Sequence, residues 1–169
     1  VNSLPNDQNG SVNGGLPIDG KAVTFIQSKL VVRDRIVWDR GQVSICYPGY
    51  PKPMQNETNA NFAYRRDKDG AHVDGLLPHG LERRRFLKEY HGFILGIPMV
   101  WTNEGASPAV VWEGSHEYIR SHLMNRYKGI NPNKWDGVDI TDVYHKARRE
   151  IFDNCKRITI HAKPGEAYL

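Results

Sequence analysis

The sequence predicts a mainly β fold, a double-stranded β-helix (a cupin-like jelly roll) with flanking helices and a helical insertion. Apolar and polar side chains alternate in residues 43–47 and again in residues 158–161, which is typical of half-buried strands. The turn sequences Pro48-Gly49 and Pro164-Gly165 follow these two segments. Helical spacing is found mainly between residues 115 and 154. Short strands with one helical insertion indicate a β-sandwich that folds as a double-stranded jelly roll.

In the N-terminal part of the chain, a loop-like segment is expected to precede a helix and a strand. Residues 1–20 are rich in Asn, Gly, Pro and Ser and lack apolar periodicity, which predicts a loop-like or disordered segment. Val23, Ile26 and Leu30 recur at helical spacing and predict a helix from residue 21 to about residue 34. A strand over residues 43–47 follows, and the Pro- and Asn-rich residues 51–61 are expected to form an exposed loop.

Two helices are predicted in the insertion. The first covers residues 115–127, and the second runs over residues 140–154 with Thr141 or Asp139 as its N-cap. The apolar face of the second helix has four-residue spacing and comprises Val143, Ala147 and Ile151. We expect the chain to return to strands over residues 158–161 and 167–169.

Composition points to one domain. A chain of 169 residues can bury its own core, no apolar stretch reaches the length of a membrane span, and no signal peptide is recognisable. Cys46 and Cys155 are too few for a disulfide framework. We therefore expect a cytoplasmic protein with a single jelly-roll domain over residues 21–169 and no membrane partner. Val1 and Leu169 look like cut ends, so the domain is expected to be incomplete at its C-terminus.

The net charge of +4 is modest; it is compatible with an anionic substrate or with nucleic acid and decides neither. We expect a small-molecule substrate and no nucleic acid. The densest basic run is Glu82-Arg83-Arg84-Arg85. A solvated face is the favoured interpretation of this run, and a clamp for a phosphate or carboxylate group is the alternative.

The tripeptide His72-Val73-Asp74 is the main candidate site. In a strand it would place an imidazole and a carboxylate on one face, which supplies two of the three ligands of a facial iron site. Asp74 would offset part of the metal charge, and His72 would need an acceptor for its second ring nitrogen. The alternative is a surface loop without metal, because the turn Lys68-Asp69-Gly70 comes just before.

Further segments follow in a fixed order: the apolar run 93–101, which we expect to form a strand, then Asn103-Glu104-Gly105, then residues 110–116, and finally Lys163-Pro164-Gly165-Glu166 with residues 167–169. Together with the His-x-Asp tripeptide, they resemble the phytanoyl-CoA dioxygenase-like family of iron and 2-oxoglutarate-dependent oxygenases over residues 43–169. Glu113 departs from the family, which usually has Pro there. The second iron His and the Arg that pairs with 2-oxoglutarate would follow Leu169.

The resemblance implies an enzyme that uses Fe(II) and the co-substrate 2-oxoglutarate. His72 and Asp74 would be its catalytic metal ligands, and the third ligand would lie beyond Leu169. The reaction would hydroxylate a small molecule and release succinate and carbon dioxide. Tyr47 is a candidate hydroxyl near 2-oxoglutarate, because its strand lies beside the iron strand in that family.

The other histidines are given structural interpretations. His116 is expected to anchor a loop near the site rather than to bind iron, and His161 is a less favoured substitute for the third ligand. Surface or satisfied polar roles are expected for His79, His91, His122 and His145. Two alternative functions remain open: a non-catalytic jelly-roll module that binds a ligand, and a hydrolase that uses another divalent metal. The sequence does not indicate the oligomeric state or the identity of the substrate.

Overall fold

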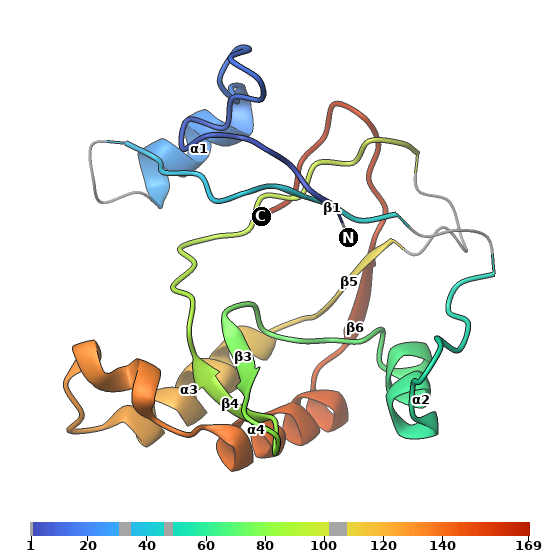
Figure 1. Cartoon of the computed structure of the whole chain (residues 1–169), viewed down its shortest axis with the longest axis vertical. Coiled ribbons are helices and arrows are strands. Elements are labelled where there is room, and N and C mark those ends of the chain that lie inside the picture. The colour runs from blue at the N-terminus through green and yellow to red at the C-terminus, as the bar shows by residue number, and fades with distance from the viewer. Residues whose placement is uncertain (1, 31–34, 46–48, 102–107) are drawn as a thin grey trace. The chain divides into compact units, whose positions relative to one another are not determined.

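The computed structural model describes residues 2–30, 35–45, 49–101 and 108–169 (Figure 1). The chain divides into two compact units. Unit 1 comprises Val1–Tyr50, Gly92–Ser107 and Ala162–Leu169, and unit 2 comprises Pro51–His91 and Pro108–His161. Whether both units fold as one domain over residues 21–169 stays a prediction.

The predicted jelly roll is wrong. The described residues form three separate two-stranded antiparallel sheets, in which β1 pairs with β2, β3 with β4, and β5 with β6. A jelly roll requires about eight strands in two stacked sheets. The apolar run 93–101 was expected to be a strand, but its described backbone contributes only an isolated bridge at Gly96. Gly96 and Pro98 interrupt the run, because glycine weakens a strand and proline cannot donate to its hydrogen-bond ladder.

Unit 1 holds β1 (Asn2–Ser3), α1 (Lys21–Lys29) and β2 (Gln42–Val43). The predicted N-terminal helix is thus confirmed over residues 21–29, whereas residues 31–34 lie outside the described part of the chain. The expected strand over residues 167–169 is reduced to a bridge in which Gly96 and Tyr168 exchange two backbone hydrogen bonds of 2.9 and 3.0 Å. A Cβ atom on Gly96 would lie 2.1 Å from the Tyr168 ring, so the bridge requires glycine.

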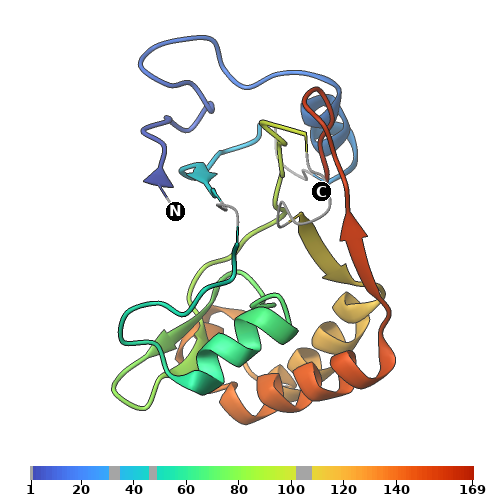
Figure 2. The same cartoon turned by 90° about the vertical axis from the view of Figure 1, so that its right-hand side faces the viewer.

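Unit 2 holds most of the regular structure. Its elements are α2 (Asn59–Asp67), β3 (Leu76–His79), β4 (Arg84–Leu87), β5 (Ala109–Trp112), α3 (Ser115–Tyr127), the 3-10 helix η1 (Pro132–Gly137), α4 (Thr141–Asn154) and β6 (Arg157–Ile160). The two helices of the predicted insertion are confirmed, and Figure 2 shows α3 and α4 side by side. Helix α2 begins inside the predicted loop 51–61, where the Thr58 side chain accepts a hydrogen bond of 3.2 Å from the nitrogen of Asn61.

The core of unit 2 lies between the β3–β4 hairpin and the two long helices. Its buried members are Leu76, Tyr127, Ile140 and Tyr144. Trp135 from η1 stacks on Tyr127 with ring centroids 4.5 Å apart. Each buried side chain of this size stabilises the fold by about 1.5–3 kcal/mol. This core therefore fixes β3 and the loop before it against α4.

Strand β4 is joined to the start of α4 through its backbone. The nitrogen of Arg85 donates a hydrogen bond of 2.8 Å to the Thr141 hydroxyl. The oxygen of Arg85 accepts one of 3.0 Å from the nitrogen of Ile140. Both backbone groups of Arg85 are thereby satisfied outside the hairpin. Within the described ranges, no helix is both long and apolar enough to cross a membrane.

Candidate metal-binding loop

His72 and Asp74 lie in the loop between α2 and β3, which we call the His72 loop (residues 68–75). The expected strand placement is wrong, because residues 71–73 have no regular structure and Asp74 lies in a turn. Asp69 and Gly70 have φ angles of 51° and 63°, in the left-handed region. Such angles end a helix and do not continue into a strand. The loop placement that the Lys68-Asp69-Gly70 turn indicated is therefore the one observed.

Two tyrosines hold the backbone on either side of His72. The Tyr64 hydroxyl of α2 donates to the backbone oxygen of Ala71. The Tyr144 hydroxyl of α4 accepts a hydrogen bond of 3.3 Å from the nitrogen of Val73. Burial raises the pKa of Tyr64, so its hydroxyl keeps the proton that it donates. Each tyrosine therefore acts as a rigid support for a loop that has no secondary structure of its own.

Both ends of the loop are also fixed. Arg157 of β6 contacts Asp69 with two hydrogen bonds of 2.7 and 2.8 Å, a bidentate geometry that sets orientation as well as distance. At the other end, the oxygen of Gly75 accepts a hydrogen bond of 2.9 Å from the nitrogen of Lys88. Gly75 has a φ of 82°, and a Cβ atom there would lie 2.3 Å from the Glu89 oxygen. Glycine is thus required for the close approach of the two backbones.

The two candidate ligands face each other across the loop. His72 Nε2 lies 3.2 Å from Asp74 Oδ1, and His72 Nδ1 lies 3.0 Å from the backbone oxygen of Gly70. A carbonyl oxygen only accepts, so this contact places a hydrogen on Nδ1 and turns Nε2 toward the carboxylate. If Nε2 carries no hydrogen, two lone pairs meet at this distance. Either a bound cation, or a hydrogen on Nε2 that is donated to Asp74, relieves this repulsion.

This geometry fits a metal ion. Two ligand atoms at about 2.1 Å from one ion and at right angles to each other are about 3.0 Å apart, close to the 3.2 Å between Nε2 and Oδ1. The Gly70 oxygen is the acceptor that a metal-bound histidine needs on its second nitrogen. Both side chains are exposed, His72 at 70% and Asp74 at 49%. Across the described residues, no group of three or more His, Cys, Asp or Glu side chains could hold a metal, so the site offers two ligands from this loop.

The remaining predicted site residues do not join this pair in the described structure. Tyr47 and the segment Asn103-Glu104-Gly105 lie outside the described residues. His116 Nε2 lies 3.1 Å from Glu117 Oε1 in the first turn of α3, where its side chain is 67% exposed. His161 follows β6. That His72 and Asp74 bind iron stays a prediction.

Sequence reasoning missed the residues that support the loop. The Arg148 guanidinium carbon lies 4.4 Å from the ring centroid of Tyr64 and 5.2 Å from that of Tyr144, so one cation packs against both supporting tyrosines. Tyr144 and Arg148 are four residues apart on α4 and share a face. The four-residue spacing of Tyr144 and Arg148 is a signal in the sequence, next to the apolar face that Val143, Ala147 and Ile151 form.

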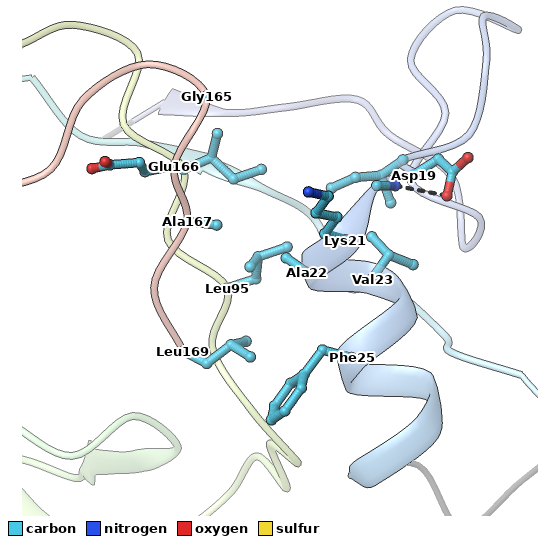
Figure 3. Close-up of a pocket in the computed structure, with 13 residues that line it drawn as sticks. Asp19, Lys21, Ala22, Val23, Phe25, Leu95, Gly165, Glu166, Ala167 and Leu169 are labelled. Carbon is cyan, nitrogen blue, oxygen red and sulfur yellow. Dashed lines mark hydrogen bonds between the residues drawn. The ribbon is translucent and has the colours of Figure 1, made fainter.

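Unit 1 contains a separate pocket of about 560 Å³ (Figure 3). Its walls are mainly apolar, with Phe25 of α1, Leu95 and Leu169 among the residues that line it. Its two carboxylates have local partners: Asp19 accepts a hydrogen bond of 2.7 Å from the nitrogen of Gly20, and Glu166 accepts one of 3.1 Å from the nitrogen of Lys163. None of the described residues that line the pocket is a His or a Cys, which distinguishes it chemically from the His72 loop.

Comparisons with protein-family models, with curated proteins and with solved structures found no match. The geometry of the His72 loop and the ordered sequence segments therefore carry the functional argument.

Proposed function

We propose that the His72 loop binds a divalent metal through His72 Nε2 and Asp74 Oδ1, and that this metal is the Fe(II) of a 2-oxoglutarate-dependent dioxygenase. The observation that carries the proposal is the 3.2 Å separation of the two atoms, with Nδ1 held by the Gly70 oxygen. The choice of iron over other metals rests on the resemblance to the phytanoyl-CoA dioxygenase-like family. The reaction would hydroxylate a small-molecule substrate and yield succinate and carbon dioxide.

Residues of the His72 loop and the two tyrosines that support it have distinct roles in this proposal. Asp74 supplies a negative charge that offsets part of the metal charge, and His72 binds as a neutral imidazole. Gly70 orients the His72 ring through its oxygen, while Tyr64 and Tyr144 keep the two ligands at a fixed spacing. Bound ferrous iron would supply the centre at which 2-oxoglutarate and dioxygen react. With two ligands from an exposed loop, we expect weak metal binding by this chain.

Two other functions use the same pair. A hydrolase would bind a different divalent ion between Nε2 and Oδ1. A non-catalytic ligand-binding module would have a proton there instead, since 3.2 Å also suits a charged hydrogen bond between an imidazolium and a carboxylate. The exposure of both side chains favours the second of these alternatives, because water stabilises a charged pair without metal.

An anaerobic titration separates the three functions. Fe(II) and then 2-oxoglutarate are added to the protein, and the visible metal-to-ligand charge-transfer band is followed. We expect the band in the wild type and its loss in His72→Ala and in Asp74→Ala. His116→Ala is the matched control, because His116 also faces a carboxylate at 3.1 Å but lies on α3. Metal binding without the band would favour the hydrolase, and no metal binding would favour the metal-free module.

A cytoplasmic location is part of the proposal. Cys155 is a free thiol, and free thiols are kept reduced in the cytoplasm. Labelling of Cys155 by a thiol reagent in intact cells, compared with lysed cells, tests the location. Equal labelling by a reagent that does not cross membranes would contradict it.

A further inference from the structure

Two arginines of unit 2 share one aromatic ring. The guanidinium carbon of Arg148 on α4 lies 5.2 Å from the centroid of the Tyr144 ring, and that of Arg85 on β4 lies 6.0 Å from it. Contacts of this kind are attractive because the ring face is electron-rich. They do not neutralise a cation, however. Two positive charges are therefore gathered around the Tyr144 ring.

Carboxylates do not balance these charges. Within the described residues, no carboxylate forms an ion pair with Arg85, Arg148 or Arg149. Arg84, next in sequence, differs because it pairs with Glu82 at 3.1 Å and with Asp139 at 3.2 Å. Within the basic run Glu82-Arg83-Arg84-Arg85, carboxylates therefore neutralise the charge of Arg84 but not that of Arg85.

One polar atom in this group has no partner. Arg148 Nε is buried and makes no hydrogen bond to any residue that the structure describes. Buried N–H groups in folded proteins are nearly always satisfied by protein, water or an ion. A charged donor without an acceptor is among the more costly of such exceptions.

The charges of these arginines also act on the neighbouring histidine, His145. Burial lowers the pKa of His145, and the charges of Arg148, Arg85 and Arg149 lower it further, while the carboxylate of Asp142 acts in the opposite direction. The ring of His145 lies 6.0 Å from that of Tyr144. His145 is itself exposed, so a ligand in solvent can reach it.

We infer that Arg85, His145 and Arg148, which we call the arginine cluster, bind a phosphate group as a dianion. Guanidinium groups bind phosphate oxygens through paired N–H donors, and a dianion balances two cations where a carboxylate balances one. Phosphate also offers acceptors in several directions, as donors from β4 and α4 require. This site does not depend on a metal at the His72 loop.

Titration with inorganic phosphate, followed by calorimetry at constant ionic strength, tests the inference. We expect saturable binding of phosphate and of methyl phosphate, and at least about tenfold weaker binding in Arg148→Gln and in Arg85→Gln. Arg120→Gln is the matched control, because Arg120 is an exposed helical arginine that pairs with Glu117 at 2.8 Å. Binding of inorganic phosphate but not of methyl phosphate would identify free phosphate rather than a phosphate ester as the ligand. Acetate binding as tight as phosphate binding, or equal phosphate affinity in all variants, would overturn the inference.

A second readout covers the case in which Arg148→Gln does not fold. Arg148→Lys keeps the positive charge and the aliphatic part of the side chain but lacks the Nε donor. We therefore expect this variant, too, to bind phosphate about tenfold more weakly than the wild type. Proton NMR of the His145 ring should also show a higher pKa with phosphate bound, because the dianion offsets the arginine charges. An unchanged His145 pKa at saturating phosphate would place the anion elsewhere.

Discussion

The hydroxyl of Tyr144 accepts a hydrogen bond of 3.3 Å from the nitrogen of Val73, a residue 71 positions earlier in the chain. Tyr144 is 2% exposed and belongs to the core of unit 2. Val73, the residue between the two candidate ligands, is thereby tied to a buried side chain of α4. The spacing of His72 and Asp74 thus depends on the packing of a distant helix.

Tyr144→Phe should remove this support and leave the ring in the core. The nitrogen of Val73 loses its acceptor, which costs about 1 kcal/mol of unfolding free energy, and its amide hydrogen should exchange faster. Tyr127→Phe is the control, because the Tyr127 hydroxyl is buried and has no hydrogen-bond partner among the described residues, so its removal should cost nothing. Urea unfolding and hydrogen exchange measure both variants; equal losses would show that the Val73 bond is unimportant.

Gly75→Ala should destabilise the chain more than Gly80→Ala. Both glycines have left-handed φ angles, of 82° and 71°, but a Cβ atom meets nothing within 4 Å at Gly80 and would lie 2.3 Å from the Glu89 oxygen at Gly75. We expect about 1 kcal/mol from the backbone angle alone at Gly80 and about 3 kcal/mol at Gly75, where the steric conflict is added. Thermal unfolding compares the two, and similar midpoints would contradict the close approach at Gly75.

Acid should weaken unit 2 through Glu57. A hydrogen bond from Arg65 lowers the pKa of Glu57 from 4.5 to about 2, and the two side chains are 2.7 Å apart. Because the folded-state pKa is depressed, the stabilising contribution of Glu57 is complete above about pH 4.5 and is lost as the pH falls toward 2. Glu57→Gln should therefore reduce the dependence of the melting temperature on pH in this window. Glu113→Gln, which changes an exposed acid in the turn after β5, should keep the wild-type dependence.

Asp69→Asn should loosen the His72 loop without unfolding the protein. The substitution removes the bidentate ion pair between Asp69 and Arg157. Because both side chains are partly exposed, this pair contributes about 0.5–1 kcal/mol to the free energy of unfolding. Asp67→Asn is a matched control, since Asp67 pairs at 2.6 Å with its own neighbour Arg66 and forms no ion pair with another element in the described part of the chain. Amide exchange in residues 70–74 should accelerate in the first variant only, and equal acceleration in both would show that Arg157 does not hold the loop.

The helices α3 and α4 could be predicted because their side-chain periodicity is local, and β6 could be predicted from alternation over four residues. The strand expected for residues 93–101 could not be judged in this way from the sequence. An apolar run indicates that a segment can be buried, but it does not indicate whether a neighbouring strand is there to pair with it. Helix α2 was missed since Pro and Asn dominate the residues before it, although Thr58 is a usual N-cap.

The candidate site was predicted only in part. His72 and Asp74 come together because they are two residues apart, a relationship that the sequence contains. The supports Tyr144 and Arg157 are far away in the chain and reach the loop through tertiary packing. The periodicity of a sequence does not indicate such tertiary contacts. His72 and Asp74 are close together as predicted, but they lie in a loop and not in the strand from which their proximity was predicted.

The backbone bonds between Arg85 and the start of α4 also bear on how the protein avoids self-association. A two-stranded hairpin has two open edges, each able to add a strand from another molecule. In the hairpin register Arg85 is opposite Pro78, which has no N–H, so the nitrogen and oxygen of Arg85 point away from β3. Because the Thr141 hydroxyl and the Ile140 nitrogen occupy both groups, the helix takes the place of an incoming strand. The outer edge of β4 is closed at its centre, and edge-to-edge aggregation through this hairpin is blocked there.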